Sequence, residues 1–451
     1  MTAAVLRALA EELPEGALLT DADVVEGYRH DRAATVRPGL PLALVRATST
    51  ADVQATLRIA SAHSIPVVPR GAGTGLSGGS SAIDGAITLS TERMRAIKVD
   101  PAAMVAVVQP GLLNAEVKAA AREHELWYPP DPSSFEICSI GGNLATNAGG
   151  LCCVKYGVTT DYVLGLEVVL ADGRAVRLGG QTIKDVAGYD LKRLFIGSEG
   201  TLGIITEATL RLRPLPPPAT TIIGTFADVV AAGQAVAAVV TGVRPSALEL
   251  MDAAAVAAVE AVRPMGLDPP IGALLLAQVD GSPDEAAAVV GCFAAAGATY
   301  VAASDDPDEG ELLMGARRMA IPCVERLGTV LIEDISVPIP RIPDLVAAVV
   351  AIAERHATAI PVIGHAGDGN LHPLVTFDAT DPEATARAEA AFDEVMIAAL
   401  RLGGTVTGEH GIGTLKARHL VQQLGPDVME MTRAVKHALD PNDILNPGKW
   451  V

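Results

Sequence analysis

Ile65-Pro-Val-Val-Pro-Arg70, followed directly by Gly71-Ala-Gly-Thr-Gly-Leu-Ser-Gly-Gly79, joins a predicted strand to a loop of glycines. Glycine lets successive backbone N–H groups converge on one anion, so the loop favours a phosphate or pyrophosphate. Residues 73–78 match the GxGxxG pattern, but the chain continues through 80–84 into a second predicted strand at 86–89, without a helix. A Rossmann βαβ unit is therefore not expected. Taken alone, the loop could also be a flexible surface loop.

Two further loops of small polar residues lie in the same half of the chain. The second comprises Pro129-Pro-Asp-Pro-Ser133 and Ile140-Gly-Gly-Asn-Leu-Ala-Thr-Asn-Ala-Gly-Gly150, and the third is Ile196-Gly-Ser-Glu-Gly-Thr-Leu-Gly-Ile-Ile-Thr206. Gly, Asn and Thr offer hydrogen bonds without adding bulk. Three such loops fit a large, extended ligand rich in heteroatoms better than a mononucleotide.

The composition predicts a globular protein of two or three domains. The chain has 451 residues, of which 49% are hydrophobic. Its 34 Lys and Arg against 53 Asp and Glu, with no basic run, argue against nucleic acid as a partner. The most apolar stretch, 229–243, is too short to span a membrane and predicts a buried helix. Five cysteines without a CxxC pattern predict reduced thiols rather than disulfides. The N-terminus lacks the features of a signal peptide, so we expect a cytoplasmic protein.

Alternating extended and Ala-rich segments predict an α+β protein with a joint at Pro214-Leu-Pro-Pro-Pro218. We expect one domain at 1–213, the linker at 214–218 and a second domain at 219–430. In the second domain we expect an antiparallel sheet covered by helices. Its predicted elements include strands at 221–226, 273–279 and 330–337 and a helix at 284–296.

A glycine-rich segment with two histidines, Gly364-His-Ala-Gly-Asp-Gly-Asn-Leu-His372, interrupts this second domain. Asp368-Gly369 favours a two-residue hairpin turn, which would place His365 directly opposite His372. Such residues share a face with Cβ atoms about 4.5–5.5 Å apart, so both imidazoles could bind one metal ion. For an isolated pair, histidines hydrogen-bonded near a turn are the alternative.

A second glycine-rich segment, Thr407-Gly-Glu-His-Gly-Ile-Gly413, could supply a third ligand from Glu409, with His410 beside it. Two histidines and one carboxylate leave open positions on a zinc-type ion. The two segments together favour a metal site over turn histidines.

These motifs together resemble a known family. Pro69–Gly79, Ser139–Gly150, Lys155-Tyr-Gly157, Gly188–Lys192 and Ile196–Thr206, in this order, are similar to the FAD-binding domain of the vanillyl-alcohol oxidase and p-cresol methylhydroxylase superfamily. The resemblance is strongest to FAD-linked D-2-hydroxyacid dehydrogenases, which include glycolate oxidase FAD-linked subunits, D-lactate dehydrogenases and D-2-hydroxyglutarate dehydrogenases. It extends to Asp440–Lys449 and implies that 431–451 returns to a two-subdomain, non-Rossmann FAD-binding domain.

The resemblance also implies which residues hold FAD. The cofactor contacts that it implies are Pro69, Arg70, Gly71, Ala72, Gly73, Thr74, Gly75, Ser77, Gly78, Pro132, Gly141, Gly142, Ala145, Thr146, Asn147, Gly149, Gly150, Glu199, Gly203, Ile205 and Asn446. Members that attach flavin covalently through the first loop carry His near the position of Thr74. The FAD should therefore be non-covalent here.

The same resemblance implies three metal ligands, His365, His372 and Glu409, and identifies His410 as the base. The expected metal is Zn²⁺, with Mn²⁺ or Fe²⁺ as alternatives. A planar guanidinium suits a substrate carboxylate, and Arg317 is expected in this role, with Arg318 left open. The chain lacks the lysine that the hydroxyglutarate branch carries near 333–338.

The function implied is FAD-dependent oxidation of a small D-2-hydroxy acid, of the D-lactate or glycolate type, to its 2-oxo acid. Metal and His410 would activate the substrate hydroxyl for hydride transfer to flavin N5. The sequence carries no site for a second redox group, so we expect an external acceptor: a quinone, an electron-transfer flavoprotein or partner subunits at the inner membrane face. The alternatives are a flavoenzyme for an alcohol or sugar lactone, a metal-dependent hydrolase, or a structural subunit of an oxidase.

Overall fold

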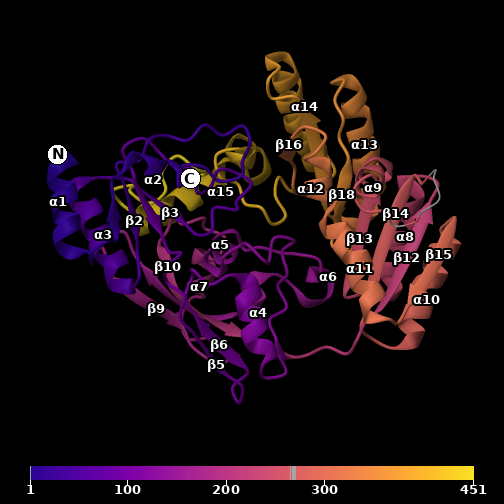
Figure 1. Cartoon of the computed structure of the whole chain (residues 1–451), viewed down its shortest axis with the longest axis horizontal. Helices are drawn as coiled ribbons and strands as arrows, with labels where there is room; N and C mark the ends of the chain where they lie inside the picture. Colours follow the sequence, from indigo (N-terminus) through magenta and orange to yellow (C-terminus); the bar gives the residue numbers. More distant parts are fainter. Residues whose placement is uncertain (1, 265, 267–270) are drawn as a thin grey trace. The chain divides into compact units, whose positions relative to one another are not determined.

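The computed structural model describes residues 2–264, 266 and 271–451, and the chain folds into two compact units (Figure 1). Unit 1 consists of Met1–Gly149, Val158–Leu215 and Glu409–Val451, and unit 2 consists of Gly150–Gly157 and Pro216–Gly408. The last segment of unit 1 starts at Glu409, whereas the sequence placed the return at residue 431. The reason is that the backbone N–H groups of Ile412 and Gly413 donate to the carboxylate of Glu199 in unit 1.

Unit 1 is built on two sheets that differ in strand direction. The first has the order β1-β2-β4-β3, with β2 and β3 both parallel to β4, and the second has the order β5-β6-β10-β8-β9 and is antiparallel. A short pair, β7 and β11, completes the unit. The strands are β1 (Leu18–Leu19), β2 (Ala43–Arg46), β3 (Val67–Arg70), β4 (Ile87–Ser90), β5 (Ile97–Asp100), β6 (Val105–Val108), β7 (Leu126–Trp127), β8 (Val163–Val169), β9 (Ala175–Gly179), β10 (Ile204–Arg211) and β11 (Arg213–Pro214).

Helices bury one face of each sheet in unit 1. They are α1 (Thr2–Glu12), α2 (Ala22–Glu26), α3 (Thr50–His63), α4 (Asn114–Arg122), α5 (Ile140–Thr146), η1 (Thr159–Tyr162), α7 (Lys192–Phe195) and α15 (Ala417–Leu439). Apolar residues of α1 and α3 form one core with β2, β3 and β4, and those of α4 and α5 form another with β6, β8 and β10. Ser49 caps the start of α3, and its hydroxyl accepts from the N–H of Asp52 in a capping box.

The parallel strands β3 and β4 position the glycine loop. Strand β3 ends at Arg70, and β4 begins at Ile87 with no helix between them. The sheet therefore lacks a Rossmann βαβ unit at this point, as the sequence predicted.

Unit 2 is an antiparallel sheet covered by helices, as expected. Its strand order is β15-β12-β14-β13-β18-β19-β16, and β17 also pairs with β19. The strands are β12 (Thr220–Phe226), β13 (Ala247–Asp252), β14 (Ala273–Val279), β15 (Tyr300–Ser304), β16 (Thr329–Ile332), β17 (Ile335–Ser336), β18 (Val362–His365) and β19 (Asn370–Phe377). The helices are α6 (Cys153–Tyr156), α8 (Val229–Gly242), α9 (Ala253–Glu260), α10 (Pro283–Ala295), α11 (Pro307–Arg318), α12 (Ala320–Val324), η2 (Ile339–Arg341), α13 (Ile342–Arg355) and α14 (Pro382–Arg401).

One predicted strand of unit 2 is interrupted. The sequence favoured a continuous strand at 330–337, but the structure has β16 and β17 with Glu333 and Asp334 between them. Both carboxylic residues are fully buried. The backbone N–H of Glu333 still donates to the carbonyl of Pro373 in β19 at 2.9 Å, while the contacts of the Asp334 side chain, described below, are made with residues 407 and 408.

Across the described ranges, no helix combines the length and the apolar character that a membrane crossing requires.

Candidate active site

The glycine loop of unit 1, residues 71–79, presents a row of backbone N–H groups. Those of residues 73–78 donate to no acceptor within the described part of the chain. The loop is held at both sides, because Arg70 Nη1 donates to the carbonyl of His30 at 2.7 Å and the Ala72 N–H donates to Ser139 Oγ at 3.2 Å. Unpaired N–H groups on a fixed loop match the hydrogen-bonding needs of phosphate oxygens.

The second predicted loop is partly helical, which corrects the sequence interpretation. Helix α5 begins after Ser139, whose hydroxyl accepts from Gly142 N–H, and ends at Asn147 in the left-handed conformation with φ 52°. Ser139 Oγ thus holds both the helix start and the glycine loop. A Cβ at Gly71 would lie 2.3 Å from Ser139 Oγ, so this approach requires glycine. Of the predicted flavin contacts, Gly141, Gly142, Ala145 and Thr146 lie on α5, Asn147 caps it, and Gly149 and Gly150 follow.

The C-terminal segment closes on the same loop. Asn446 Nδ2 donates to the carbonyls of Gly79 at 2.9 Å and Glu199 at 2.8 Å. Lys449 Nζ donates to the carbonyl of Gly78 at 2.9 Å, and burial lowers the pKa of this lysine to about 8. Asn446 Oδ1 is buried with no hydrogen-bond partner in the described ranges, so it can still accept a hydrogen bond.

Glu199 is a buried carboxylate beside this segment. It accepts from the N–H groups of Ile412 at 2.7 Å and Gly413 at 2.8 Å. Burial nevertheless raises its pKa to about 7. Because a raised pKa means that the charged form is disfavoured, Glu199 can hold a proton at neutral pH.

Three further predicted flavin contacts, Pro132, Gly203 and Ile205, lie outside the glycine loop and α5. Pro132 lies in the chain before α5, where its carbonyl accepts from Phe135 N–H. Ile205 is a core residue of β10, and Gly203 directly precedes this strand. A Cβ on Gly203 would lie 2.5 Å from Val168 Cγ1, so close packing explains this glycine. Unit 1 therefore offers unpaired N–H groups and a buried acceptor, which fit a ligand with phosphates and N–H or O–H donors such as FAD.

In unit 2, the histidine hairpin differs in register from the prediction. His365 pairs with Asn370, and Ile363 pairs with His372, so the turn has four residues, 366–369, instead of two. The Asp368 carboxylate accepts from Asn370 N–H, and Gly369 takes φ 86°, which together support the longer turn. His365 and His372 are diagonal neighbours on one face.

Both histidines of the hairpin are buried and oriented by acceptors. Their ring centroids lie 5.2 Å apart at an interplanar angle of 85°. His365 Nδ1 lies 2.8 Å from Glu249 Oε1, and His372 Nδ1 lies 3.2 Å from the carbonyl of Glu333. Because these oxygens only accept hydrogen bonds, Nδ1 is the donor in each ring, and in a neutral ring the lone pair then lies on Nε2.

Asp334, in the interruption between β16 and β17, is a residue that the sequence analysis did not select. Its Oδ2 accepts from Thr407 Oγ1 at 2.6 Å and from Gly408 N–H at 2.9 Å, and its Oδ1 lies 3.8 Å from His372 Nδ1. These bonds fix the chain immediately before Glu409. Two adjacent carboxylic residues inside an apolar strand pattern were the signal that could have identified it.

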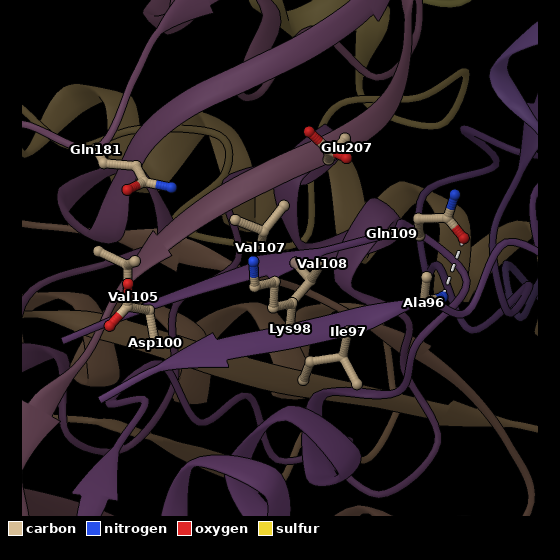
Figure 2. Close-up of a pocket in the computed structure, with 10 residues that line it drawn as sticks. All are labelled: Ala96, Ile97, Lys98, Asp100, Val105, Val107, Val108, Gln109, Gln181 and Glu207. Atoms are coloured by element: carbon tan, nitrogen blue, oxygen red, sulfur yellow. Dashed lines mark hydrogen bonds between the residues drawn. The ribbon is translucent and has the colours of Figure 1, made fainter. Parts of the chain in front are cut away.

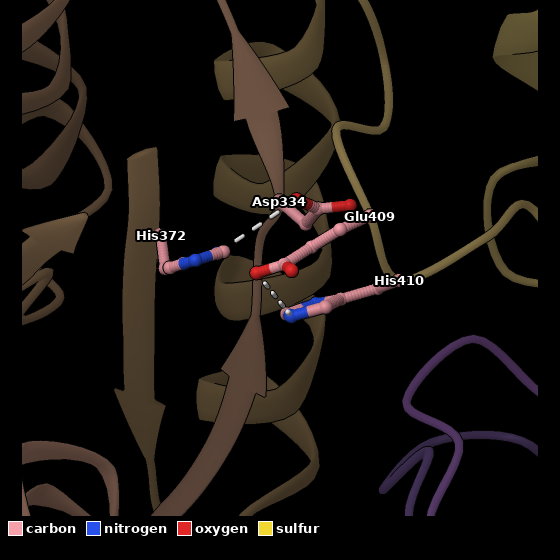
Figure 3. Close-up of side chains that lie close together, drawn as sticks. All are labelled: Asp334, His372, Glu409 and His410. Carbon is pink, nitrogen blue, oxygen red and sulfur yellow. Dashed lines mark ion pairs between the residues drawn. The ribbon is translucent and has the colours of Figure 1, made fainter. Parts of the chain in front are cut away.

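Asp334, His372, Glu409 and His410 form a group of side chains that could hold a metal ion (Figure 3). His410 Nε2 lies 3.9 Å from Glu409 Oε1. Carboxylate oxygens and imidazole nitrogens are suitable ligands for Zn²⁺, Mn²⁺ or Fe²⁺. The donor set of the chain therefore fits a divalent metal.

The two candidate arginines differ in burial and in the residue with which each forms an ion pair. Arg317, in the last turn of α11, has a side chain only 2% exposed, with Nη2 2.9 Å from Glu249 Oε2. Its Nε is buried and has no hydrogen-bond partner among the described residues. Arg318 instead pairs with Glu311, which is exposed. Of the two, Arg317 is the one built into the interior of unit 2.

Comparison with known proteins adds to this geometry. Residues 41–179 match a family model described as FAD binding domain, and residues 215–450 match one described as FAD linked oxidases, C-terminal domain. The chain belongs to the FAD-linked oxidases. It is 41% identical to the glycolate oxidase subunit GlcD of Bacillus subtilis (strain 168), over 94% of this chain and 91% of the relative. It is 36% identical to a D-lactate dehydrogenase of Anaerostipes hadrus, over 100% and 97%.

The fold of this FAD-linked oxidase is shared with p-cresol methylhydroxylase. The TM-score is 0.83 at 19% identity, over 99% of this chain and 96% of the other. A 4-ethylphenol oxidase from Gulosibacter chungangensis gives 0.81 at 20% identity, over 99% and 96%. These likenesses establish the p-cresol methylhydroxylase type of fold, as the sequence predicted, and the match to the FAD binding domain supports FAD as the cofactor.

A pocket of this FAD-linked oxidase lies on β5, β6 and β10 of unit 1 (Figure 2). Its volume is about 390 Å³. Its lining residues are Ala96, Ile97, Lys98, Asp100, Val105, Val107, Val108, Gln109, Gln181 and Glu207. Two of these residues are hydrogen-bonded to each other, because Gln109 Oε1 accepts from Ala96 N–H at 3.0 Å. It includes no predicted flavin, metal or substrate residue.

Proposed function

We propose that this chain is an FAD-dependent dehydrogenase that oxidises a small D-2-hydroxy acid, of the D-lactate or glycolate type, to the 2-oxo acid with the help of a divalent metal. Relatives named as a glycolate oxidase subunit and as D-lactate dehydrogenases support this substrate class. The observation that carries the proposal is the buried Arg317, which shares the carboxylate of Glu249 with His365.

The substrate carboxylate would bind Arg317. Its Nε donor is buried and has no hydrogen-bond partner in the described ranges, so the protein leaves it available for an anionic ligand. A guanidinium holds a carboxylate through two parallel hydrogen bonds, which fixes the substrate in orientation as well as position.

The metal would be held by His365 and His372 through Nε2, together with the carboxylates of Glu409 and Asp334. The Nδ1 contacts of both histidines support this assignment, because a neutral ring that donates from Nδ1 has its lone pair on Nε2. Asp334 extends the ligand set that the sequence implied. Zn²⁺ is the proposed ion, with Mn²⁺ and Fe²⁺ as alternatives.

His410 would accept the proton of the substrate hydroxyl. It follows Glu409 directly, and a cation bound at Glu409 would disfavour the protonated imidazolium, as the role of base requires. FAD supplies the hydride acceptor and the metal supplies a Lewis acid. Electrons would then pass to an external acceptor: a quinone, an electron-transfer flavoprotein or partner subunits, as the word subunit in a relative's name suggests.

The test is anaerobic flavin reduction. The purified protein is mixed with D-lactate, L-lactate, glycolate or D-2-hydroxyglutarate, with and without chelator, while the flavin band at about 450 nm is followed. We expect chelator-sensitive bleaching by D-lactate or glycolate. Bleaching only by an alcohol or a sugar lactone, or bleaching that survives complete metal removal, would refute the substrate or the metal proposal respectively.

A further inference from the structure

Glu249 is a buried carboxylate in the interior of the unit 2 sheet. It lies on β13 between β14 and β18 and is 1% exposed, with Leu248 and Leu250 buried on either side. An ionised group in such a position is unfavourable unless it is paired. The partners of Glu249 therefore indicate why a carboxylate is present in an apolar strand.

Glu249 contacts two candidate site residues at once. Strands β13 and β18 pair Leu250 with Gly364, so the antiparallel register brings Glu249 opposite His365. Glu249 Oε1 and Oε2 lie 2.8 and 3.0 Å from His365 Nδ1. Oε2 also lies 2.9 Å from Arg317 Nη2. One carboxylate thus joins a residue of β18 to a residue of α11.

We propose that Glu249 is a positioning residue that holds His365 and Arg317 in a fixed relation for metal and substrate binding; this inference rests on the proposed function. The Glu249 carboxylate accepts from His365 Nδ1 and so fixes the orientation of the ring, with Nε2 as the nitrogen that would bind a metal ion. The same carboxylate fixes the guanidinium of Arg317 and leaves its Nε donor for the substrate.

The chemistry of a 2-hydroxy acid explains why one residue should hold both His365 and Arg317. Its carboxylate and hydroxyl groups lie on neighbouring carbons, so the arginine that binds one and the metal that binds the other must keep a constant spacing. Two separate acceptors would allow His365 and Arg317 to move independently. A shared acceptor couples their positions, and small errors in such positions reduce rates strongly.

The test compares Glu249→Gln with the wild type in the full-length, FAD-loaded protein. Metal dissociation constants are measured by competition with a chelator, using Zn²⁺ and Mn²⁺ as probes, and KM and kcat for D-lactate are measured at saturating metal. Glutamine keeps the size of the side chain but loses the charge. We expect metal binding to weaken about 10–100-fold and KM to rise, with unchanged FAD content.

The matched control is Asp252→Asn on the same strand. Asp252 accepts from Ala255 N–H at 2.8 Å and Val362 N–H at 2.9 Å, so it caps a helix and contacts no candidate site residue among its described partners. This variant should lower stability but keep the wild-type metal affinity. Glu249→Asp, which keeps the charge, serves as the second variant if Glu249→Gln does not fold, and its shorter side chain should also weaken metal binding.

The outcomes separate this inference from the proposed function. A wild type that binds metal, with a Glu249→Gln protein that binds it equally tightly at unchanged KM, overturns the inference alone. Equal losses of metal affinity in Glu249→Gln and Asp252→Asn also overturn it, since both would then report general destabilisation. A wild type that binds no metal overturns the metal proposal and this inference together.

Discussion

Replacing Asp334 by Asn or Ala should remove a metal ligand and loosen the chain that carries Glu409. Asp334 accepts from Thr407 Oγ1 at 2.6 Å and from Gly408 N–H at 2.9 Å. A hydrogen bond to a charged group contributes about 1.5–3 kcal/mol to stability, so the Ala variant should lower the free energy of unfolding of the metal-free protein by about 3–6 kcal/mol. The Asn variant keeps an acceptor oxygen and should lose about half of this.

The effect on metal binding is separate from that on folding. Loss of an outer partner of a metal ligand weakens binding about 10–100-fold, so loss of a ligand itself should reach at least about 100-fold. At a metal concentration that gives the wild type 100 times its dissociation constant, metal binding stabilises the protein by about 2.7 kcal/mol. Nearly all of this stabilisation should disappear in Asp334→Asn.

The assay is urea unfolding followed by circular dichroism, with and without Zn²⁺, alongside metal content after dialysis. Asp378→Asn is the matched control: Asp378 accepts from the N–H and the hydroxyl of Thr380 at 2.8 and 2.7 Å, the same donor types that Asp334 binds, but it is exposed. This control should keep the wild-type response to metal. If Asp334→Asn gains as much stability from metal as the wild type does, Asp334 is not a ligand and the argument fails.

Two further predictions concern the substrate and the pH dependence of stability. Arg317→Lys should raise KM for D-lactate about 10–100-fold at unchanged FAD content, whereas Arg318→Lys at the surface should keep the wild-type kinetics. A raised KM in Arg318→Lys with an unchanged KM in Arg317→Lys would assign the substrate role to Arg318. Burial raises the pKa of Glu199 from 4.5 to about 7, so between these pH values the folded protein holds a proton that the unfolded chain releases. The free energy of unfolding of the FAD-free protein should therefore fall by up to about 3 kcal/mol as the pH rises from about 4.5 to 7. Glu199→Gln should lack this decrease in urea unfolding, and parallel pH profiles for the two proteins would contradict the assignment.

The sequence by itself determined the structural features that depend only on residues close together along the chain. The glycine loop after Arg70 and the absence of a helix before β4 could be predicted, because glycine conformation and strand periodicity are local properties. The same is true of the apolar strands β12 and β14, which the structure places within a residue of their predicted bounds. Helix α5 was missed because its Gly and Asn content is typical of a loop, whereas the capping by Ser139 favours a helix.

Only the tertiary structure shows which of the candidate residues contact one another and which other residues join them. The hairpin register depends on a four-residue turn, and local turn preference favoured two residues. Asp334 and Thr407 are 73 residues apart, and Glu249 and His365 are 116 apart, so no local pattern relates them. The sequence favoured Arg317 by resemblance and left Arg318 open, and packing buries Arg317 against Glu249 while Arg318 pairs with the exposed Glu311. Local chemistry thus predicts which residue types can bind a metal or an anion, while long-range strand pairing decides which of them share a carboxylate.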